Sequence, residues 1–266
     1  MRMTLQMRQS HNISYTDVGI GRALVFVHGM PGSWQSWLPQ LEAFSPQYRV
    51  IAIDLPGYGA SKYRADLDTP AKVADLLLCF LDDVAKGETV HFVGLSLGGM
   101  IGMEYAARAG ASLATLTLLD CSPRFGLDGS SYADAFVEQV AAPLREGVRL
   151  EDLSRSILQG LVGPQCPESA FRTALSAMLR TTPDGLVQAA RLIGNHDASA
   201  KLGAISVPTL VMAGEADQAT PLAYSELIAE SMGNARLVTV PTAGHLSNIE
   251  NPKFVNDQLA AFLSEA

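Results

Sequence analysis

The chain has 266 residues, of which 48% are hydrophobic and 17% charged, a balance typical of folded globular proteins. Its formal net charge of -8 argues against a polyanionic partner, because nucleic acid or an acidic lipid surface would repel it. The composition is not that of a disordered chain, and the length suits one α/β unit that carries an insertion.

The cysteines and the N-terminal segment bear on the compartment. Cys79, Cys121 and Cys166 lie far apart and in no spacing typical of a metal or redox site, so we expect free thiols in a reducing environment. Residues 1–15 lack the continuous apolar segment of a secretory signal. No apolar run approaches the ~20 residues of a membrane span. We therefore expect a cytoplasmic protein without a membrane partner.

Short apolar segments alternate with amphipathic ones through the first half of the chain. Ser33 and Thr69 are suitable N-caps for two helices, and a third helix is expected after Ser96. The predicted strands are mostly apolar along their length, which is typical of a parallel sheet covered on both faces. These strands are 13–17, 23–27, 48–53, 90–93 and 113–119.

The pattern changes at Pro123, and until about Ala200 apolar residues recur only at helical spacing. Strands are predicted again at 207–214 and 235–240, with helices at about 222–232 and 252–263. The sequence thus predicts an α/β core of residues 1–122 and 201–266, and a helical insertion at 123–200. Breaks between the insertion's helices are expected at Pro143, Gly163-Pro164, Pro167 and Pro183-Asp184-Gly185.

A Gly-x-Ser-x-Gly motif, Gly94 to Gly98, directly follows the strand predicted from Val90. Because Gly94 and Gly98 lack a Cβ, the strand end and the helix start can approach within backbone contact, which holds Ser96 in a strained turn. The free N–H groups of the following helix point at the same spot, where they would stabilise negative charge. A structural turn in a nucleotide-binding α/β protein is the alternative. We predict that Ser96 is a nucleophile.

A serine nucleophile needs a base within hydrogen-bond reach and an acid that orients the base. Asp217 and His245 each follow a predicted strand, at the sheet edge where α/β proteins form ligand sites. The chain order Ser, Asp, His is the one that accompanies Gly-x-Ser-x-Gly on this architecture. We therefore predict a triad of Ser96, His245 and Asp217. Asp120 also ends a strand at this edge and stays an alternative for the acid.

An oxyanion hole requires two N–H donors aimed at the developing charge. The residue after the nucleophile, Leu97, supplies one, and the loop after the strand at 23–27 supplies the other. Met30 is the expected second donor, because the residue that follows it is a proline. A simple turn would also explain His28 and Gly29, but the position of this loop favours a functional role. We assign substrate contacts to His28, Gly29 and Trp34.

The motifs together resemble the α/β-hydrolase superfamily along essentially the whole chain. This resemblance implies an eight-stranded, mostly parallel sheet flanked by helices, with the segment 123–200 as a helical lid after the sixth strand. It also implies the oxyanion and triad roles given above. The matching motifs, in order, are His28-Gly29, Asp54-x-Pro56-Gly57-x-Gly59-x-Ser61, Gly94-x-Ser96-x-Gly98-Gly99, Gly214-x-x-Asp217 and Gly244-His245.

Short local matches are similar to 3-oxoadipate enol-lactonases, and they occur also in esterases of the same subgroup. Ser96 excludes dehalogenases and epoxide hydrolases of this fold, which would need Asp there. A cofactor-free esterase or lactonase acting on a small molecule is expected. A carbon–carbon hydrolase, a thioesterase, a perhydrolase and a hydrolase-fold ligand receptor stay open. The matching segments are 94–100, Ala219-Thr220-Pro221 and 245–250.

An enol-lactone of the kind implied carries a carboxylate, which a buried arginine would bind well. The predicted insertion contains arginines and no lysine, and Arg124 lies nearest to the strand that ends at Asp120. We expect Arg124 to contact the substrate. No metal is expected, because His11, His91 and His196 are isolated in the sequence, and the oligomeric state is left open. The insertion's arginines are Arg124, Arg145, Arg149, Arg155, Arg172, Arg180 and Arg191.

Overall fold

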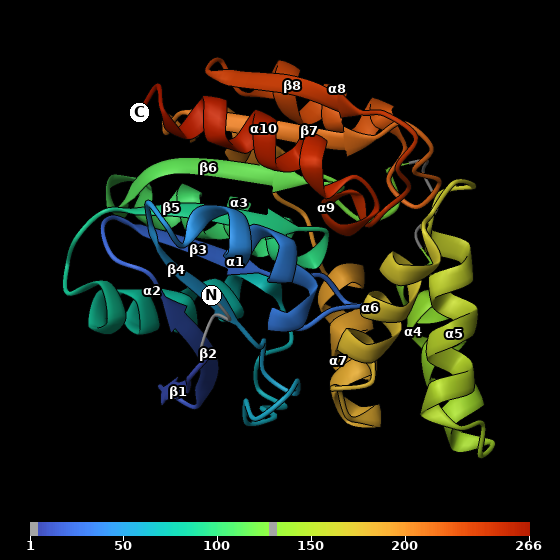
Figure 1. Ribbon diagram of the computed structural model, residues 1–266. Helices are drawn as coiled ribbons and strands as arrows, with labels where there is room; N and C mark the ends of the chain where they lie inside the picture. The colour runs from blue at the N-terminus through green and yellow to red at the C-terminus, as the bar shows by residue number, and fades with distance from the viewer. Residues whose placement is uncertain (1–4, 128–131) are drawn as a thin grey trace.

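An eight-stranded sheet runs through the structure, a computed structural model that describes residues 5–127 and 132–266 (Figure 1). The strand order is β1-β2-β4-β3-β5-β6-β7-β8. β1 pairs antiparallel with β2 and β2 with β4, and all later pairs are parallel. The strands are β1 (Met7–Ser10), β2 (Ile13–Val18), β3 (Ala23–Val27), β4 (Arg49–Ile53), β5 (Val90–Leu95), β6 (Leu113–Leu119), β7 (Thr209–Gly214) and β8 (Ala235–Val240).

The strands expected from the sequence are all present, and the mostly parallel sheet is confirmed. Every residue of β3, β5 and β7 is buried, as their continuous apolar sequences require. β1 was not predicted. Its residues are exposed or half-buried, and three of the four are polar, so hydrophobic pattern gives no signal for them.

Helices cover both faces of the sheet, with α1 and α10 on one side and α2, α3 and α8 on the other (Figure 1). Thr69 caps α2 as expected, because its side chain accepts a hydrogen bond from the Lys72 N–H and Pro70 is the first helical residue. Ser33 instead caps a short 3-10 turn, after which α1 begins. The segments are η1 (Trp34–Trp37), α1 (Leu38–Phe44), α2 (Pro70–Ala85), α3 (Leu97–Ala109), η2 (Gly110–Ser112), η3 (Ser199–Ala204), α8 (Leu222–Ser231), α9 (Ser247–Glu250) and α10 (Pro252–Leu263).

Between β6 and β7, the described residues form the α-helices α4 to α7, which we call the helical insert. They gather beyond the carboxyl ends of the parallel strands (Figure 1). Pro143 does not separate two helices as expected, because it lies within the last turn of α4. Residues 1–4 and 128–131 of the predicted segments lie outside the described residues. The insert consists of α4 (Ala133–Arg145), α5 (Leu150–Leu161), α6 (Glu168–Met178) and α7 (Pro183–Gly194).

The parallel strands bring their carboxyl ends to one edge of the sheet, beneath the insert. The loops after β3, β5, β6, β7 and β8 therefore meet there, although more than two hundred residues separate the first from the last. Cys79, Cys121 and Cys166 are free thiols. Within 5–127 and 132–266, no helix is long and apolar enough to cross a membrane.

Candidate active site

The turn between β5 and α3 holds Ser96 in an unusual backbone conformation. Its φ of 52° and ψ of -118° lie in a region that residues with a side chain rarely adopt. A Cβ on Gly94 would overlap the Gly98 carbonyl, and a Cβ on Gly98 would overlap the Val27 carbonyl. The predicted steric reason for both glycines is therefore confirmed. The strain is maintained because the surrounding backbone leaves Ser96 no other arrangement.

The structure brings Ser96, His245 and Asp217 together. His245 Nε2 lies 2.9 Å from Ser96 Oγ, and His245 Nδ1 lies 2.8 Å from Asp217 Oδ2. The tautomer with its proton on Nδ1 satisfies both contacts, since Nδ1–H then donates to Asp217 and Nε2 accepts from the Ser96 hydroxyl. All three residues are buried. This is a continuous hydrogen-bonded path from a carboxylate to a serine hydroxyl.

Asp217 is held by its own loop as well as by His245. Its Oδ1 accepts hydrogen bonds from the Ala219 N–H at 2.8 Å and the Thr220 N–H at 3.0 Å. The Thr220 hydroxyl donates to Asp217 Oδ2 at 2.7 Å. Motif reasoning gave Thr220 no role, although an aspartate often binds backbone N–H groups two or three residues later in a turn. Thr220 thus fixes the carboxylate that faces His245.

Burial and charge act in opposite directions on the His245–Asp217 pair. Burial lowers the pKa of His245, but the charge and hydrogen bond of Asp217, together with the charges of Asp120 and Glu250, outweigh this and leave that pKa above its ordinary value. Burial likewise raises the pKa of Asp217, yet the charge and hydrogen bond of His245 bring it below its ordinary value. The pair therefore favours an imidazolium beside a carboxylate, the charge state that a general base reaches after taking a proton.

Asp120 occupies a different place from the one an orienting acid needs. Its Oδ1 accepts from the Gly214 N–H at 2.8 Å and its Oδ2 from the Ser247 N–H at 3.0 Å. Both oxygens therefore bind backbone, and among the described residues no hydrogen bond joins Asp120 to His245. Burial, with the nearby Asp217 charge, raises the pKa of Asp120 to about 7. Asp120 links the end of β7 to the start of α9, and the geometry favours Asp217 as the acid.

The loop after β3 packs directly against the nucleophile. A Cβ placed on Gly29 would lie 2.9 Å from Ser96 Cβ, so only glycine permits this approach. His28 Nδ1 donates to the Gly29 carbonyl at 2.7 Å, which fixes the peptide whose N–H belongs to Met30. Within the described part of the chain, no acceptor is present for the N–H of Met30 or Leu97. These two donors beside Ser96 suit an oxyanion hole.

A cavity of about 360 Å³ opens over Ser96 and His245. Arg124 lines it, as do Met30 and Thr220, together with side chains of α4, α5 and α7. Its wall is mostly apolar, so it suits a small organic molecule with few polar groups. Other lining residues, none of them predicted, are Pro31, Met100, Ser122, Phe125, Gly126, Phe136, Gln139, Val140, Ile157, Leu161, Ile193, Ala219 and Tyr224.

Three predicted substrate contacts do not line this cavity. His28 is fully buried, and both ring nitrogens bind backbone, because Nε2 accepts from the Leu55 N–H at 3.0 Å. Gly29 packs on Ser96, as described. Trp34 donates its backbone N–H to Asp54 Oδ1 at 3.0 Å and is buried within η1. The geometry gives these residues a role in shaping the loop rather than in touching a ligand.

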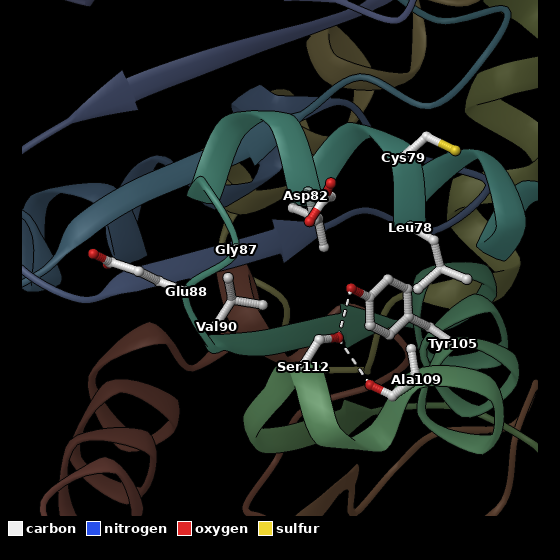
Figure 2. Close-up of a pocket in the computed structure, with 10 residues that line it drawn as sticks. Leu78, Cys79, Asp82, Gly87, Glu88, Val90, Tyr105, Ala109 and Ser112 are labelled. Atoms are coloured by element: carbon white, nitrogen blue, oxygen red, sulfur yellow. Dashed lines mark hydrogen bonds between the residues drawn. The ribbon is translucent and has the colours of Figure 1, made fainter.

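A second hollow of about 380 Å³ lies between α2 and α3, near the amino end of β5 (Figure 2). Two of its polar side chains bind each other, since Tyr105 Oη lies 3.0 Å from Ser112 Oγ, which donates to the Ala109 carbonyl. None of the triad lines it. Across residues 5–127 and 132–266, no group of three or more His, Cys, Asp or Glu side chains could hold a metal ion.

Comparisons with known proteins agree with this geometry. A model of the alpha/beta hydrolase family matches residues 24–258. A pimeloyl-(acyl-carrier protein) methyl ester esterase of Chromobacterium violaceum is 31% identical over 238 residues, which cover 88% of this chain and 91% of that protein. The 3-oxoadipate enol-lactonase 1 of Acinetobacter baylyi is 28% identical, over 88% of this chain and 85% of that protein.

Similarity extends to solved structures. A thermophilic esterase from Thermogutta terrifontis superposes with a TM-score of 0.84 at 28% identity, over 95% of this chain and 93% of that chain. The structure has the expected eight-stranded sheet, and the family model covers most of the chain. The chain belongs to the alpha/beta hydrolase family.

Proposed function

We propose that this protein is a serine hydrolase that cleaves a small carboxylic ester or lactone through an acyl-enzyme. The observation that carries the proposal is the hydrogen-bonded path from Asp217 through His245 to Ser96, which ends in a cavity of about 360 Å³. A protein that only binds a ligand would have no use for three buried polar groups in this arrangement. The arrangement suits a hydroxyl that must lose its proton during attack.

In the acylation step, Ser96 Oγ attacks the carbonyl carbon while its proton passes to His245 Nε2. Asp217 holds the imidazole in the required tautomer and stabilises the imidazolium that forms. The carbonyl oxygen becomes negative and accepts hydrogen bonds from the N–H groups of Met30 and Leu97. The bond to the leaving oxygen then breaks, and that oxygen takes the proton from His245.

In the deacylation step, water replaces the alcohol. His245 takes a proton from the water, whose oxygen attacks the acyl carbon and forms a second tetrahedral intermediate in the same oxyanion hole. Collapse of the intermediate returns the proton to Ser96 Oγ and releases a carboxylic acid. For a lactone, both products are parts of one opened molecule, so the alcohol stays attached to the acid.

We further propose that the substrate carries a carboxylate that Arg124 binds. Arg124 lines the cavity, is half-buried, and belongs to the segment between β6 and the insert. A guanidinium binds a carboxylate with two parallel hydrogen bonds in a partly dry site. Two relatives support this substrate class: the Acinetobacter baylyi protein is an enol-lactonase, and the Thermogutta terrifontis esterase was solved with malate bound.

A substrate screen tests the proposal. Wild-type protein and Ser96→Ala are compared on a neutral ester, an enol-lactone carrying a carboxylate, a thioester and a vinylogous diketone. We expect Ser96-dependent turnover of the ester and the lactone. Turnover of the diketone alone would replace the proposal with carbon–carbon hydrolysis, and lack of turnover on every substrate would count against an enzyme.

A further inference from the structure

Behind the triad histidine lies a buried carboxylate that the proposed reaction does not use. Glu250, the last residue of α9, is only 9% exposed. Its Oε2 accepts from the Gly163 N–H at 2.8 Å and the Gly244 N–H at 3.1 Å, and its Oε1 accepts from the Leu246 N–H at 3.1 Å. Within the described residues no cation pairs with it. Backbone donors alone therefore stabilise this charge.

The three donors come from two segments that are distant in the sequence. Gly244 and Leu246 flank His245, whereas Gly163 belongs to the linker between α5 and α6 of the insert. One charged acceptor therefore joins the loop that carries the proposed base to the layer that covers the cavity. A hydrogen bond to a charged group contributes more to stability than one between neutral groups.

The backbones of the two segments also touch directly. The His245 N–H donates to the Leu161 carbonyl at 2.8 Å. A Cβ on Gly163 would lie 2.7 Å from the Gly244 nitrogen, closer than a side chain can be accommodated. Leu161 in turn lines the cavity. The insert and the histidine loop are thus packed without intervening side chains at this point.

Several charges face His245 from the elements packed around it. Asp217 lies on the loop after β7, Asp120 follows β6, and Glu250 ends α9; each of them favours the protonated imidazole. On the insert side, Cys166 is near Glu250, and burial together with that charge raises the pKa of its thiol to about 11. This thiol stays neutral, so it does not offset the effect of Glu250 on His245.

We propose that Glu250 is a positioning residue that holds the His245 backbone in reach of Ser96 and ties it to the helical insert at Gly163. The proposal rests on the hydrolase function proposed above. It has two separable parts. First, the hydrogen bonds of Glu250 to Gly244 and Leu246 fix the position of the His245 imidazole. Second, the negative charge of Glu250 raises the proton affinity of that imidazole.

Glu250→Gln tests the proposal with a shape-preserving change. The amide keeps one acceptor oxygen but turns an NH2 group toward at least one backbone donor, so the loop should shift. We expect kcat to fall roughly 10- to 100-fold, because small misplacements of catalytic groups have effects of that size. Loss of the negative charge should also move the acid limb of the kcat/KM profile to lower pH.

Glu215→Gln is the matched control. Glu215 is exposed, and its Oε2 accepts from the Thr242 N–H at 2.9 Å, in the same loop. Among the described residues it forms no hydrogen bond with Gly163, Gly244 or Leu246, the three donors that Glu250 binds. We expect wild-type kcat and an unchanged pH midpoint for this control. Thermal unfolding of all proteins is measured in parallel, so that a loss of folded protein is separated from a loss of rate.

The outcomes separate this proposal from the hydrolase proposal. Wild-type kcat with an unmoved midpoint in Glu250→Gln would overturn the positioning role, provided that turnover depends on Ser96. A fall in kcat matched by the unfolded fraction, again with an unmoved midpoint, would also overturn it. If the Ser96→Ala variant turns over substrate at the wild-type rate, the hydrolase mechanism itself is wrong.

Gly163→Ala covers the case in which Glu250→Gln does not fold. The added methyl forces the insert away from Gly244 and leaves the Glu250 charge in place. We expect a lower kcat with an unchanged pH midpoint. Wild-type kcat in Gly163→Ala would overturn the coupling between the insert and His245.

Discussion

At the residue scale, the surroundings of Ser96 suit the nucleophile that we propose it to be. Its φ of 52° is costly, and the backbone of β3 and α3 leaves room for it only because Gly94 and Gly98 have no side chains. The hydroxyl then lies 2.9 Å from His245 Nε2. The backbone strain and the hydrogen bond of the hydroxyl therefore occur in the same residue.

Removing that hydroxyl is the first prediction at this scale. Ser96→Ala should fold as the wild type does and lose turnover by ~10⁴- to 10⁶-fold, because deletion of one member of a triad disables the unit. Steady-state kinetics and thermal unfolding measure the two effects. Retention of more than a few per cent of activity would contradict an acyl-enzyme on Ser96.

The two buried aspartates should differ in effect. Asp217→Asn removes the acceptor of the His245 Nδ1 proton and favours the wrong tautomer, so kcat should fall ~10⁴-fold. Asp120→Asn leaves the 2.8 Å contact between Asp217 and His245 in place and should have a much smaller effect. Measured kcat values in the reverse order would make Asp120 the acid.

The pH profile follows from the charge state of His245. Only the neutral imidazole accepts the Ser96 proton, so the rate should rise with pH as His245 loses its proton. Because the carboxylates around His245, Asp217 foremost, together outweigh burial and raise its pKa, the midpoint of kcat/KM should lie above ~6.5. A flat profile between about pH 5 and 8, with chemistry rate-limiting, would contradict His245 as the base.

Among the elements, three helices of the insert contribute to the cavity wall. α4, α5 and α7 supply apolar side chains, whereas Arg124 supplies a positive charge before the first of these helices. Shape and charge at the cavity thus come from different parts of the same segment.

A substitution in this segment separates charge from shape. Arg124→Met should raise KM for an anionic lactone by a larger factor than for a neutral ester of similar size, because only the first substrate loses an ion pair. Arg172→Met is the matched control, since Arg172 is exposed and pairs with Glu168 on α6. Equal changes for both substrates would remove the anion-binding role.

Sequence pattern predicted the buried elements well and the contacts between them poorly. The strands of the core and the helices of the insert have strong hydrophobic periodicity, and the chain order of Ser96, Asp217 and His245 predicted their meeting point. β1 has no such pattern, because it is an exposed edge strand. Pro143 was placed outside a helix, yet the last turn of α4 accommodates it.

The roles of Thr220 and Glu250 could not be inferred from the sequence. Thr220 acts through a side-chain bond to Asp217, and Glu250 binds Gly163, which is 87 residues away in the chain. Both depend on loop conformation, which local composition does not determine. Conversely, His28 and Trp34, to which substrate contacts were assigned, bind groups of the protein: the His28 ring binds backbone, and the Trp34 N–H donates to the Asp54 carboxylate.

At the scale of the whole molecule, the parallel sheet brings the residues of the candidate active site together. β3, β5, β6, β7 and β8 end at one edge, and their loops supply the Met30 donor, Ser96, Asp120, Asp217 and His245 respectively. The insert then covers this edge. The central claim of the account is that this assembly makes Ser96 a nucleophile, which no other serine of the chain should be.

Covalent labelling tests that claim most directly. A serine-reactive phosphonate is added to the wild type, to Ser96→Ala and to His245→Ala, and the modified residue is located by mass spectrometry. We predict prompt stoichiometric labelling at Ser96 in the wild type, none in Ser96→Ala, and labelling slowed at least ~100-fold in His245→Ala, where the base is lost. Labelling at another residue, or at Ser96 with equal speed in His245→Ala, would contradict the account.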